Sequence, residues 1–241
     1  MADRYFLEIP PADGTALLSG SEAHHLAHVM RARAGDEVLL FDGSGAEYTA
    51  RVEQIGRAEI RLAVVSRRDA DVELAAEVEL GVALPKGERQ RWLVEKAVEL
   101  GVRRLTPLVT HRGVAQPTGT AIVRLRRAVI EASKQCGRNR LMEIAEPQPL
   151  AEYLPRQAPD TLRWFAHPGG MPLSAAFRTA DQQSAPRGAL FAVGPEGGFD
   201  DQEVALAREH RWQIVDLGRR TLRVETAALA FAAIAAARFQ N

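Results

Sequence analysis

The spacing of apolar residues changes near residue 70. This change indicates that the chain has two parts, each with a different kind of fold. Before that point, short segments of alternating polarity are separated by turn residues such as Gly43-Ser44-Gly45. Runs of this kind predict strands of a small antiparallel barrel or sheet; they lie at 37–43, 47–55 and 59–66. One helix is expected among them, from Ser21 as its N-cap to about Arg31.

From Val78 onward, strands alternate with helices, which predicts an α/β fold with a largely parallel sheet. The expected strands lie at 78–84, 105–110, 163–167, 189–194 and 213–218, and the expected helices at 88–101, 121–135 and from Glu225 onward. Gly101 stands at the C-terminal cap of the first of these helices. The acidic stretch 69–79 leads from one pattern to the other, so we expect domains at 1–70 and 71–241.

Positive charge is concentrated in one part of the chain. The whole sequence has 31 basic and 31 acidic residues, so net charge alone indicates neither a nucleic-acid nor a membrane partner. Between Lys86 and Arg140, however, 13 Lys and Arg stand against 4 Asp and Glu. This region is a candidate surface for a polyanion.

The sequence indicates a cytoplasmic protein without a membrane segment or a metal. Cys136 is the only cysteine, which excludes an intramolecular disulfide and a cysteine-rich zinc site. The N-terminus lacks the apolar core of a signal peptide, and the longest apolar run, 227–237, is shorter than the ~20 residues that span a bilayer. His24 and His28 have helical i, i+4 spacing, but no third ligand accompanies them.

Three of the expected strands end in unusual segments, at 166–170, 194–198 and 217–226. In open parallel sheets, ligands bind outside the carboxyl ends of the strands. Each segment taken singly is explained as well by an ordinary glycine turn. Together they predict the walls of one pocket.

The pocket lacks the sequence marks of a nucleotide phosphate site. Neither G-x-G-x-x-G nor G-x-x-x-x-G-K-[ST] occurs, and Glu196 stands where a phosphate loop carries lysine. The Gly-Pro-Glu-Gly-Gly turn offers backbone groups and a carboxylate to a ligand with an adenine, a ribose and a cationic centre. S-adenosylmethionine has these parts and is the expected cofactor.

Several motifs resemble the ribosomal RNA small subunit methyltransferase E family. They are KGERQRWLVEKAVELGV (86–102), EASKQCGRNR (131–140), GPEGGF (194–199) and LGRRTLRVETAAL (217–229), with HHLAHVMRARAGDEVLLFDGSG (24–45) in the N-terminal part. The resemblance implies a SPOUT-type C-terminal domain with a trefoil knot and an N-terminal PUA-like β-barrel. It also implies methylation of uridine N3 in 16S ribosomal RNA, an assembled small subunit as substrate, and a homodimer.

Two residues depart from the family pattern. Val224 stands where threonine is common, and Met142 where proline is common. Valine keeps the β-branched shape but lacks the hydroxyl, so no role is assigned to that side chain. The neighbours Arg223, Glu225 and Thr226 match the pattern.

The resemblance implies a bent cofactor that the three loops contact mostly through their backbone. Carried to matching positions, the expected cofactor-binding residues are His167, Gly194, Glu196, Gly197, Leu217, Gly218, Leu222 and Thr226. Thr226 opens the last helix with Glu225, and a helix N-terminus favours an anion such as the methionine carboxylate.

Methylation of uridine N3 requires removal of a proton and stabilisation of negative charge on O2 and O4. We expect Arg223 to supply that stabilisation as a permanently charged donor, with Glu196 or Glu225 as proton acceptor. The alternative for Arg223 is a structural ion pair with one of those glutamates.

For RNA binding, the expected phosphate contacts lie in the N-terminal helix region and in the cationic region; they are Arg31, Arg33, Arg112, Arg138 and Arg140. The alternative is that these arginines only cover solvated helix faces. Two other functions stay open: a SPOUT enzyme with another target, such as a ribose 2′-O, and a non-catalytic RNA-binding assembly factor.

Overall fold

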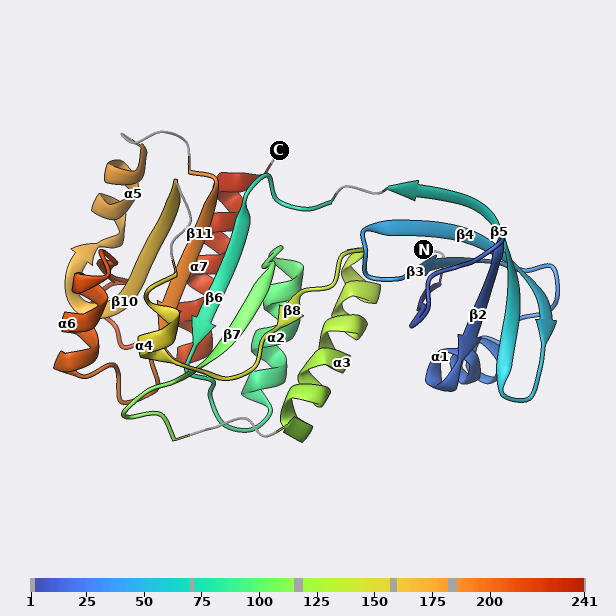
Figure 1. The fold of residues 1–241 in the computed structure, drawn as a ribbon, viewed down its shortest axis with the longest axis horizontal. Coiled ribbons are helices and arrows are strands. Elements are labelled where there is room, and N and C mark those ends of the chain that lie inside the picture. Colours follow the sequence, from blue (N-terminus) through green and yellow to red (C-terminus); the bar gives the residue numbers. More distant parts are fainter. Residues whose placement is uncertain (1–2, 70–71, 115–118, 157–159, 182–185, 241) are drawn as a thin grey trace. The chain divides into compact units, whose positions relative to one another are not determined.

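The structure, a computed structural model, describes residues 3–69, 72–114, 119–156, 160–181 and 186–240. By its internal contacts the chain forms two compact units. The first unit consists of Met1–Glu73 and Ile130–Leu141, and the second of Leu74–Val129 and Met142–Asn241. Segment 130–141, which lies inside the expected C-terminal domain by sequence, thus packs with the first unit. Figure 1 colours the chain from its blue N-terminus to its red C-terminus.

A five-stranded sheet, in the order β1-β3-β4-β5-β2, makes up most of the first unit. Its strands are β1 (Arg4–Phe6), β2 (Thr15–Ser19), β3 (Glu37–Phe41), β4 (Ala46–Ile55) and β5 (Glu59–Asp69). All pairs are antiparallel except β1 with β3. The three predicted strands are confirmed, and β3 and β4 form a hairpin around the turn residues Gly43-Ser44-Gly45.

The helix of the first unit begins earlier than predicted and changes its form. It consists of α1 (Gly20–His24) followed by a π-helical turn, η1 (His25–Val29). Ser19, with an extended backbone, occupies the N-cap position, so the prediction of Ser21 as the cap is wrong. Arg31 has a φ of 55°, which ends the helical course.

The second unit contains a seven-stranded sheet in which every pairing is parallel, as predicted. Its order is β12-β10-β11-β6-β7-β8, with β9 also on β7. The strands are β6 (Glu77–Val82), β7 (Arg104–Val109), β8 (Glu143–Ile144), β9 (Gln148–Pro149), β10 (Thr161–Pro172), β11 (Gly188–Val193) and β12 (Gln213–Asp216). The helices are α2 (Arg89–Glu99), α3 (Gly119–Cys136), α4 (Leu150–Tyr153), α5 (Leu173–Asp181), α6 (Asp201–Glu209) and α7 (Val224–Phe239); the part of α3 from Ile130 onward belongs to the first unit.

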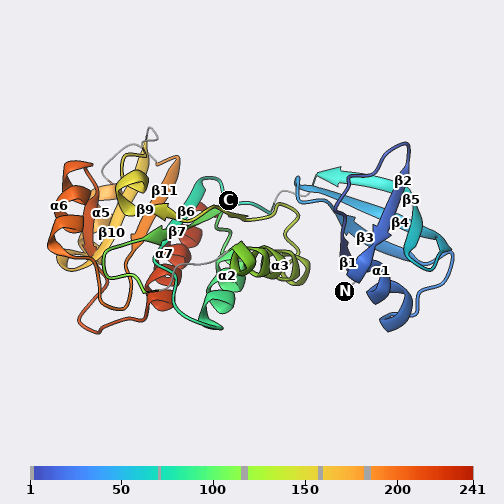
Figure 2. The same cartoon turned by 60° about the horizontal axis from the view of Figure 1, so that its bottom comes forward.

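Helices cover both faces of this sheet, so its central strands are apolar on both sides. Trp164 of β10 contacts Phe177 of α5 and Phe231 of α7. The next residue, Phe165, points to the other face and packs with the cluster under α4 and α6. α7 lies against β11, β6 and α2, as both views show (Figures 1 and 2).

Helix α2 ends at the predicted glycine. Gly101 has a φ of 78°, which glycine adopts without a steric cost. Its N–H donates to the Val98 carbonyl at 3.1 Å, and the Val102 N–H donates to the Ala97 carbonyl at 3.0 Å. These two bonds form a Schellman motif, which fixes the turn from α2 into β7.

The parallel sheet and the N-terminal β unit match the predicted fold class, while the trefoil knot stays a prediction. Because all strands of the sheet run the same way, the carboxyl ends of β10, β11 and β12 lie at one edge. Within the described chain, no helix has both the length and the apolar character needed to cross a bilayer.

Candidate active site

A cavity of about 410 Å³ opens at the carboxyl ends of β10, β11 and β12. Three segments form its walls: the β10 bend (residues 167–170), the β11 loop (194–200) and the β12 loop (217–223). Residues from all three line the cavity, together with Val224 and Ala227 of α7. This volume lies in the range of small-molecule sites, about 300–1,000 Å³.

The β10 bend is a bulge inside a strand. Pairing with β12 shifts register between Ala166 and Met171, so the residues between them leave the ladder, and His167 and Pro168 line the cavity. Gly170 is required there, because a Cβ would lie 2.7 Å from the Ile214 carbonyl oxygen. His167 donates from Nδ1 to the Pro168 carbonyl at 2.7 Å, which leaves its Nε2 as an acceptor in the neutral ring.

Asp216, the last residue of β12, joins two walls of the cavity. One carboxylate oxygen accepts the Gly169 N–H at 3.0 Å, and the other accepts the Gly218 N–H at 2.8 Å. Gly218 has a φ of 122°, a region that favours glycine. Among the described residues, no backbone N–H in 219–222 has a hydrogen-bond partner, so these donors are available to a ligand.

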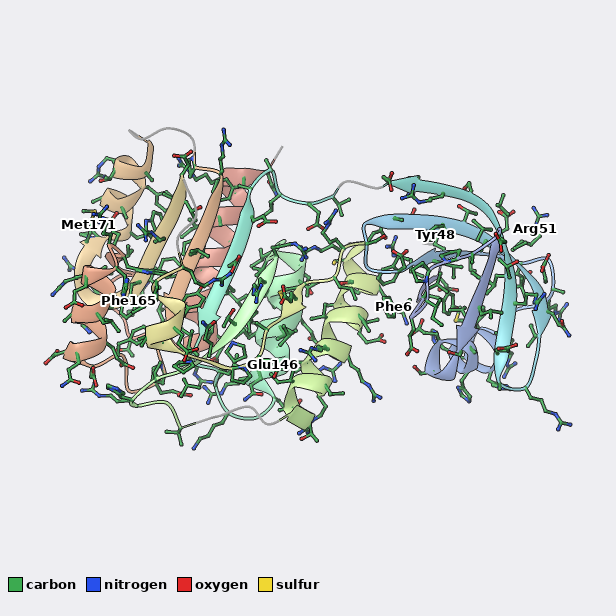
Figure 3. The ribbon with its side chains drawn as sticks, in the orientation of Figure 1. Phe6, Tyr48, Arg51, Glu146, Phe165 and Met171 are labelled. Carbon is green, nitrogen blue, oxygen red and sulfur yellow. The ribbon has the colours of Figure 1, made fainter. Side chains whose placement is uncertain are left out.

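The β11 loop begins with a tight turn, in which the Gly198 N–H donates to the Pro195 carbonyl at 2.8 Å. Gly194 lets the Phe199 ring cover the end of the strand, because a Cβ there would lie 2.9 Å from that ring. Phe199 packs on Phe165, with 4.0 Å between ring centroids. Figure 3 labels Phe165, which belongs to β10.

Two arginines from other elements reach the β11 loop. Arg89, the first residue of α2, lies 3.2 Å from Glu196 Oε1 and 3.6 Å from Glu225 Oε2. Arg112, which follows β7, donates from Nη1 to the Gly197 carbonyl at 3.0 Å. The loop is therefore held by a side chain–side chain contact and by a side chain–backbone contact.

The β11 loop ends in a capping box at the start of α6. The Asp200 side chain accepts the Glu203 N–H, and the Glu203 side chain accepts the Asp200 N–H. Glu203 also accepts the His111 N–H at 2.9 Å, and His111 Nδ1 lies 2.6 Å from Asp200. Every carboxylate oxygen of these two residues thus has a partner, so the His–Asp–Glu cluster is explained without a metal.

The cluster shifts the pKa values of two exposed groups. The hydrogen bond to Asp200 and its charge raise the pKa of His111. The Glu203 N–H, and then the His111 side chain, lower the pKa of Asp200. Both shifts favour a charged pair at the base of the β11 loop.

Most residues expected to bind the cofactor lie around the cavity. The lining ones are His167, Gly194, Glu196, Gly197, Leu217, Gly218 and Leu222. Thr226 is exposed and does not line it. Val224 is buried and presents an apolar side chain to the cavity, so the missing hydroxyl leaves no unpaired polar group there.

The three expected catalytic residues are placed differently. Glu196 lines the cavity, while Glu225 is 5% exposed, does not line it and faces Arg89. Arg223 is exposed between two lining residues, Leu222 and Val224. Among the described residues Arg223 forms no ion pair with either glutamate, and Arg89 contacts both.

The five expected RNA contacts also differ. Arg31, Arg33 and Arg140 are exposed in the first unit, and Arg112 is exposed at the cavity of the second unit. Arg138 is 3% exposed, and its guanidinium donates two hydrogen bonds to Glu73, at 2.8 and 2.6 Å. The prediction that Arg138 contacts RNA is therefore wrong, because this residue forms a buried structural ion pair.

Sequence reasoning missed four residues of the site. Asp216 lies inside the predicted strand 213–218, and Arg219 and Arg220 lie inside the predicted wall 217–226, but none of the three was given a role, although the strand-end rule that selected Leu217 applies to them equally. Arg89 carried no such signal, because only tertiary structure brings it to residues more than one hundred positions away.

The sequence matches two known domain families. An RNA methyltransferase domain matches residues 72–236, and an RNA methyltransferase PUA domain matches residues 18–65. A ribosomal RNA small subunit methyltransferase E from Synechocystis is 33% identical over 89% of this chain and 70% of its own length. The protein of that name from Bacillus subtilis is 28% identical over 94% of this chain and 93% of its own length.

Solved structures agree with this result. Ribosomal RNA small subunit methyltransferase E from Neisseria gonorrhoeae, bound to S-adenosyl methionine, is 28% identical with a TM-score of 0.85. The alignment covers 97% of this chain and 96% of that one. The resemblance seen in the motifs is thereby confirmed: the chain belongs to the ribosomal RNA small subunit methyltransferase E family.

Proposed function

We propose that this protein transfers the methyl group of S-adenosylmethionine to N3 of a uridine in 16S ribosomal RNA. The observation that carries the proposal is the cavity at three strand ends, which has unpaired backbone donors in the β12 loop. Family membership supports the cofactor, since the Neisseria gonorrhoeae relative is bound to S-adenosyl methionine.

The residues present fit this cofactor. The N–H groups of 219–222 have no partner in the described chain and suit the hydrogen-bonding edge of an adenine. The apolar side chains of Leu217, Leu222 and Val224 suit the faces of that ring. When bound, the cofactor supplies an electrophilic methyl group, and the protein's main task is to hold that group in line with the attacking atom.

On the base side, the protein has to remove a proton and stabilise an anion. Glu196 is the proton acceptor in this proposal, because it lines the cavity while Glu225 does not. Arg223 stabilises the negative charge on the base, because its exposed guanidinium has no ion-pair partner in the described structure.

The RNA itself is held by phosphate contacts outside the cavity. We assign these contacts to Arg31, Arg33 and Arg140 of the first unit and to Arg112 at the cavity, without Arg138. Guanidinium groups bind phosphate oxygens with two parallel hydrogen bonds. The substrate in this proposal is the assembled small subunit, and the protein acts in the cytoplasm, where ribosomes are built.

The protein acts as a homodimer in this proposal. The outward face of α7 is lined by small side chains, among them Ala230, Ala233 and Ala237, which are only partly buried or exposed. Such residues allow two helices to approach closely. The N-terminal end of α7 lies beside the cavity, since its buried residues Val224 and Ala227 line it.

Mass mapping of 16S RNA tests the reaction directly. Unmodified small subunits are incubated with the protein and S-adenosylmethionine, and the methylated nucleotide is identified by nuclease digestion and mass spectrometry. A single product at uridine N3 is expected. A methyl group on a ribose would replace the proposal with the 2′-O alternative, and cofactor binding without any RNA product would favour a non-catalytic assembly factor.

A further inference from the structure

The β11 loop, which is one wall of the proposed cofactor pocket, has few contacts of its own that keep its shape. This loop contains Gly197 and Gly198, which lack side chains that would pack against a neighbour. Within the loop, one backbone hydrogen bond joins the Gly198 N–H to the Pro195 carbonyl. Glycine-rich segments lose much conformational entropy when they are ordered. Contacts from outside the loop therefore have to offset that cost.

Arg89 supplies the first outside contact. It lies at the start of α2, where its guanidinium reaches Glu196 of the loop and Glu225 of α7. The side chain of Glu225 is only 7% exposed, and its Oε2 has no hydrogen-bond partner in the described chain apart from this ion pair. Arg89 is thus the charge partner of this buried carboxylate, and that contact keeps its guanidinium beside the loop.

Arg112 supplies the second outside contact. Its Nη1 donates to the Gly197 carbonyl at 3.0 Å, and its Cβ and Cδ lie within 3.6 Å of where a Gly197 Cβ would be. The arginine stem therefore covers the glycine, and its head binds the adjoining carbonyl. Arg89 and Arg112 thus hold consecutive residues, Glu196 and Gly197, from two different elements.

We propose that Arg89 and Arg112 form a clamp that holds the β11 loop in the conformation that receives S-adenosylmethionine. Both are positioning residues: Arg89 acts through Glu196, and Arg112 acts through the Gly197 backbone. This inference rests on the proposed function, because it takes the cavity as the cofactor site. Both arginines belong to the cationic region, which the sequence indicated only as a candidate surface for RNA. The clamp gives these two residues a role in cofactor affinity.

Cofactor affinity of the full-length protein without RNA measures the clamp. Calorimetric titration with S-adenosylmethionine should give a dissociation constant raised about three- to fivefold for Arg89→Met and for Arg112→Met, because partly exposed ion pairs and hydrogen bonds contribute modestly. Two matched variants serve as controls. Arg91→Met removes the exposed pair with Glu95 on the same helix, and Arg126→Met removes a donor to the Ile144 carbonyl. Both controls should bind like the wild type.

A double-mutant cycle tests whether Arg89 acts through Glu196. If it does, Arg89→Met combined with Glu196→Gln binds the cofactor no more weakly than the weaker of the two single variants. Additive losses would overturn this part of the clamp. Arg89→Lys keeps the charge and should restore part of the affinity, which separates loss of the contact from a folding defect.

Amide hydrogen exchange gives a readout that needs no cofactor. The peptide that contains residues 194–198 should exchange faster in Arg112→Met than in Arg126→Met, because its backbone loses an external bond. Unchanged exchange together with unchanged affinity would overturn the clamp. Wild-type protein that binds the cofactor but yields no uridine N3 product would overturn the proposed reaction alone, and wild-type protein that does not bind it would overturn both.

Discussion

The β11 loop and the β12 loop face the same cavity but are held in different ways. The β11 loop is held from outside, by Arg89 and Arg112. The β12 loop is held from its own start, where Asp216 accepts the N–H groups of Gly169 and Gly218. One loop therefore depends on side chains from distant parts of the chain, and the other depends on a local carboxylate.

The charged side chains of the two loops also differ in whether they are paired. The two carboxylates of the β11 loop, on Glu196 and Asp200, are paired with Arg89 and His111. The arginines of the β12 loop, Arg219, Arg220 and Arg223, have no ion-pair partner among the described residues. From this difference we infer that the β11 loop serves the cofactor pocket alone, whereas the β12 loop offers its backbone to the cofactor and its arginine side chains to an anionic substrate.

The largest effect is expected for Arg223→Ala in the β12 loop. Removing a donor that stabilises developing charge typically lowers the rate about 100- to 1,000-fold. The single-turnover rate of methyl transfer to small subunits should fall by that amount, while cofactor affinity should stay within about twofold, since Arg223 does not line the cavity.

Arg208→Ala is the matched control, because Arg208 is an exposed arginine in the last turn of α6, away from both loops. It should methylate at the wild-type rate. An Arg223→Ala protein with unchanged rate and unchanged affinity would remove Arg223 from the mechanism and would transfer the cationic role to Arg219 or Arg220.

The fold was predictable where strands are long and apolar, and less so where they are short. β6, β7, β11 and β12 are confirmed close to their predicted bounds. The strands β8, β9 and β1 have only two or three residues and depend on pairing with a neighbouring strand. No local sequence pattern therefore predicts them. β10 runs beyond its predicted end at 167, because Gly169-Gly170 forms a bulge and the strand pairs with β12 again at Met171.

The candidate site followed from one rule, that ligands bind at the carboxyl ends of parallel strands. This rule selected residues whose backbone lines the cavity, such as Gly194 and Leu217. It could not identify pairs formed by tertiary packing. Arg138 looked available in the sequence but pairs with Glu73, and Glu225 looked catalytic but faces Arg89.

Gly194→Ala should destabilise the β11 loop where it leaves the sheet. A Cβ would lie 2.9 Å from the Phe199 ring, which is 3% exposed and packs on Phe165, so the ring has little room to move. Overpacking of this kind costs about 1–3 kcal/mol. Chemical denaturation should show this loss in the free energy of unfolding.

Gly197→Ala provides the comparison within the same loop. A Cβ there meets Arg112 at 3.5 Å, an ordinary contact distance. Its free energy of unfolding should stay close to the wild-type value. Equal losses in both variants would mean that the loop is rigid throughout, rather than tightly packed only at Gly194.

Asp216→Asn tests how the β12 loop is held. The amide keeps one acceptor oxygen, but its NH₂ group then faces an N–H donor, so one of the two bonds to Gly169 and Gly218 is lost. A lost bond of about 1 kcal/mol corresponds to roughly fivefold weaker cofactor binding. Asp201→Asn, at an exposed residue in the first turn of α6, should bind normally in the same titration.

The smallest effect is expected at the base of the β11 loop, where His111 pairs with Asp200. The pKa of His111 is raised, chiefly by its bond to Asp200, so its stabilisation is complete below the unfolded value near ~6.5 and is lost as pH rises through the folded pKa. The pKa of Asp200 is lowered, chiefly by the Glu203 N–H, so its stabilisation is complete above about 3.9 and is lost as pH falls through the folded pKa.

The pair therefore stabilises the folded protein most between about pH 4 and pH 6.5. His111→Gln removes the charge, so its melting temperature should lie below that of the wild type at pH 5, and this gap should narrow by pH 8.5. His210→Gln, which alters a histidine that pairs with no carboxylate in the described chain, should show no such change. If the difference in melting temperature between His111→Gln and the wild type is the same at both pH values, His111 contributes through packing and not through charge. The arginines of the β12 loop would then be the main charged groups of the pocket.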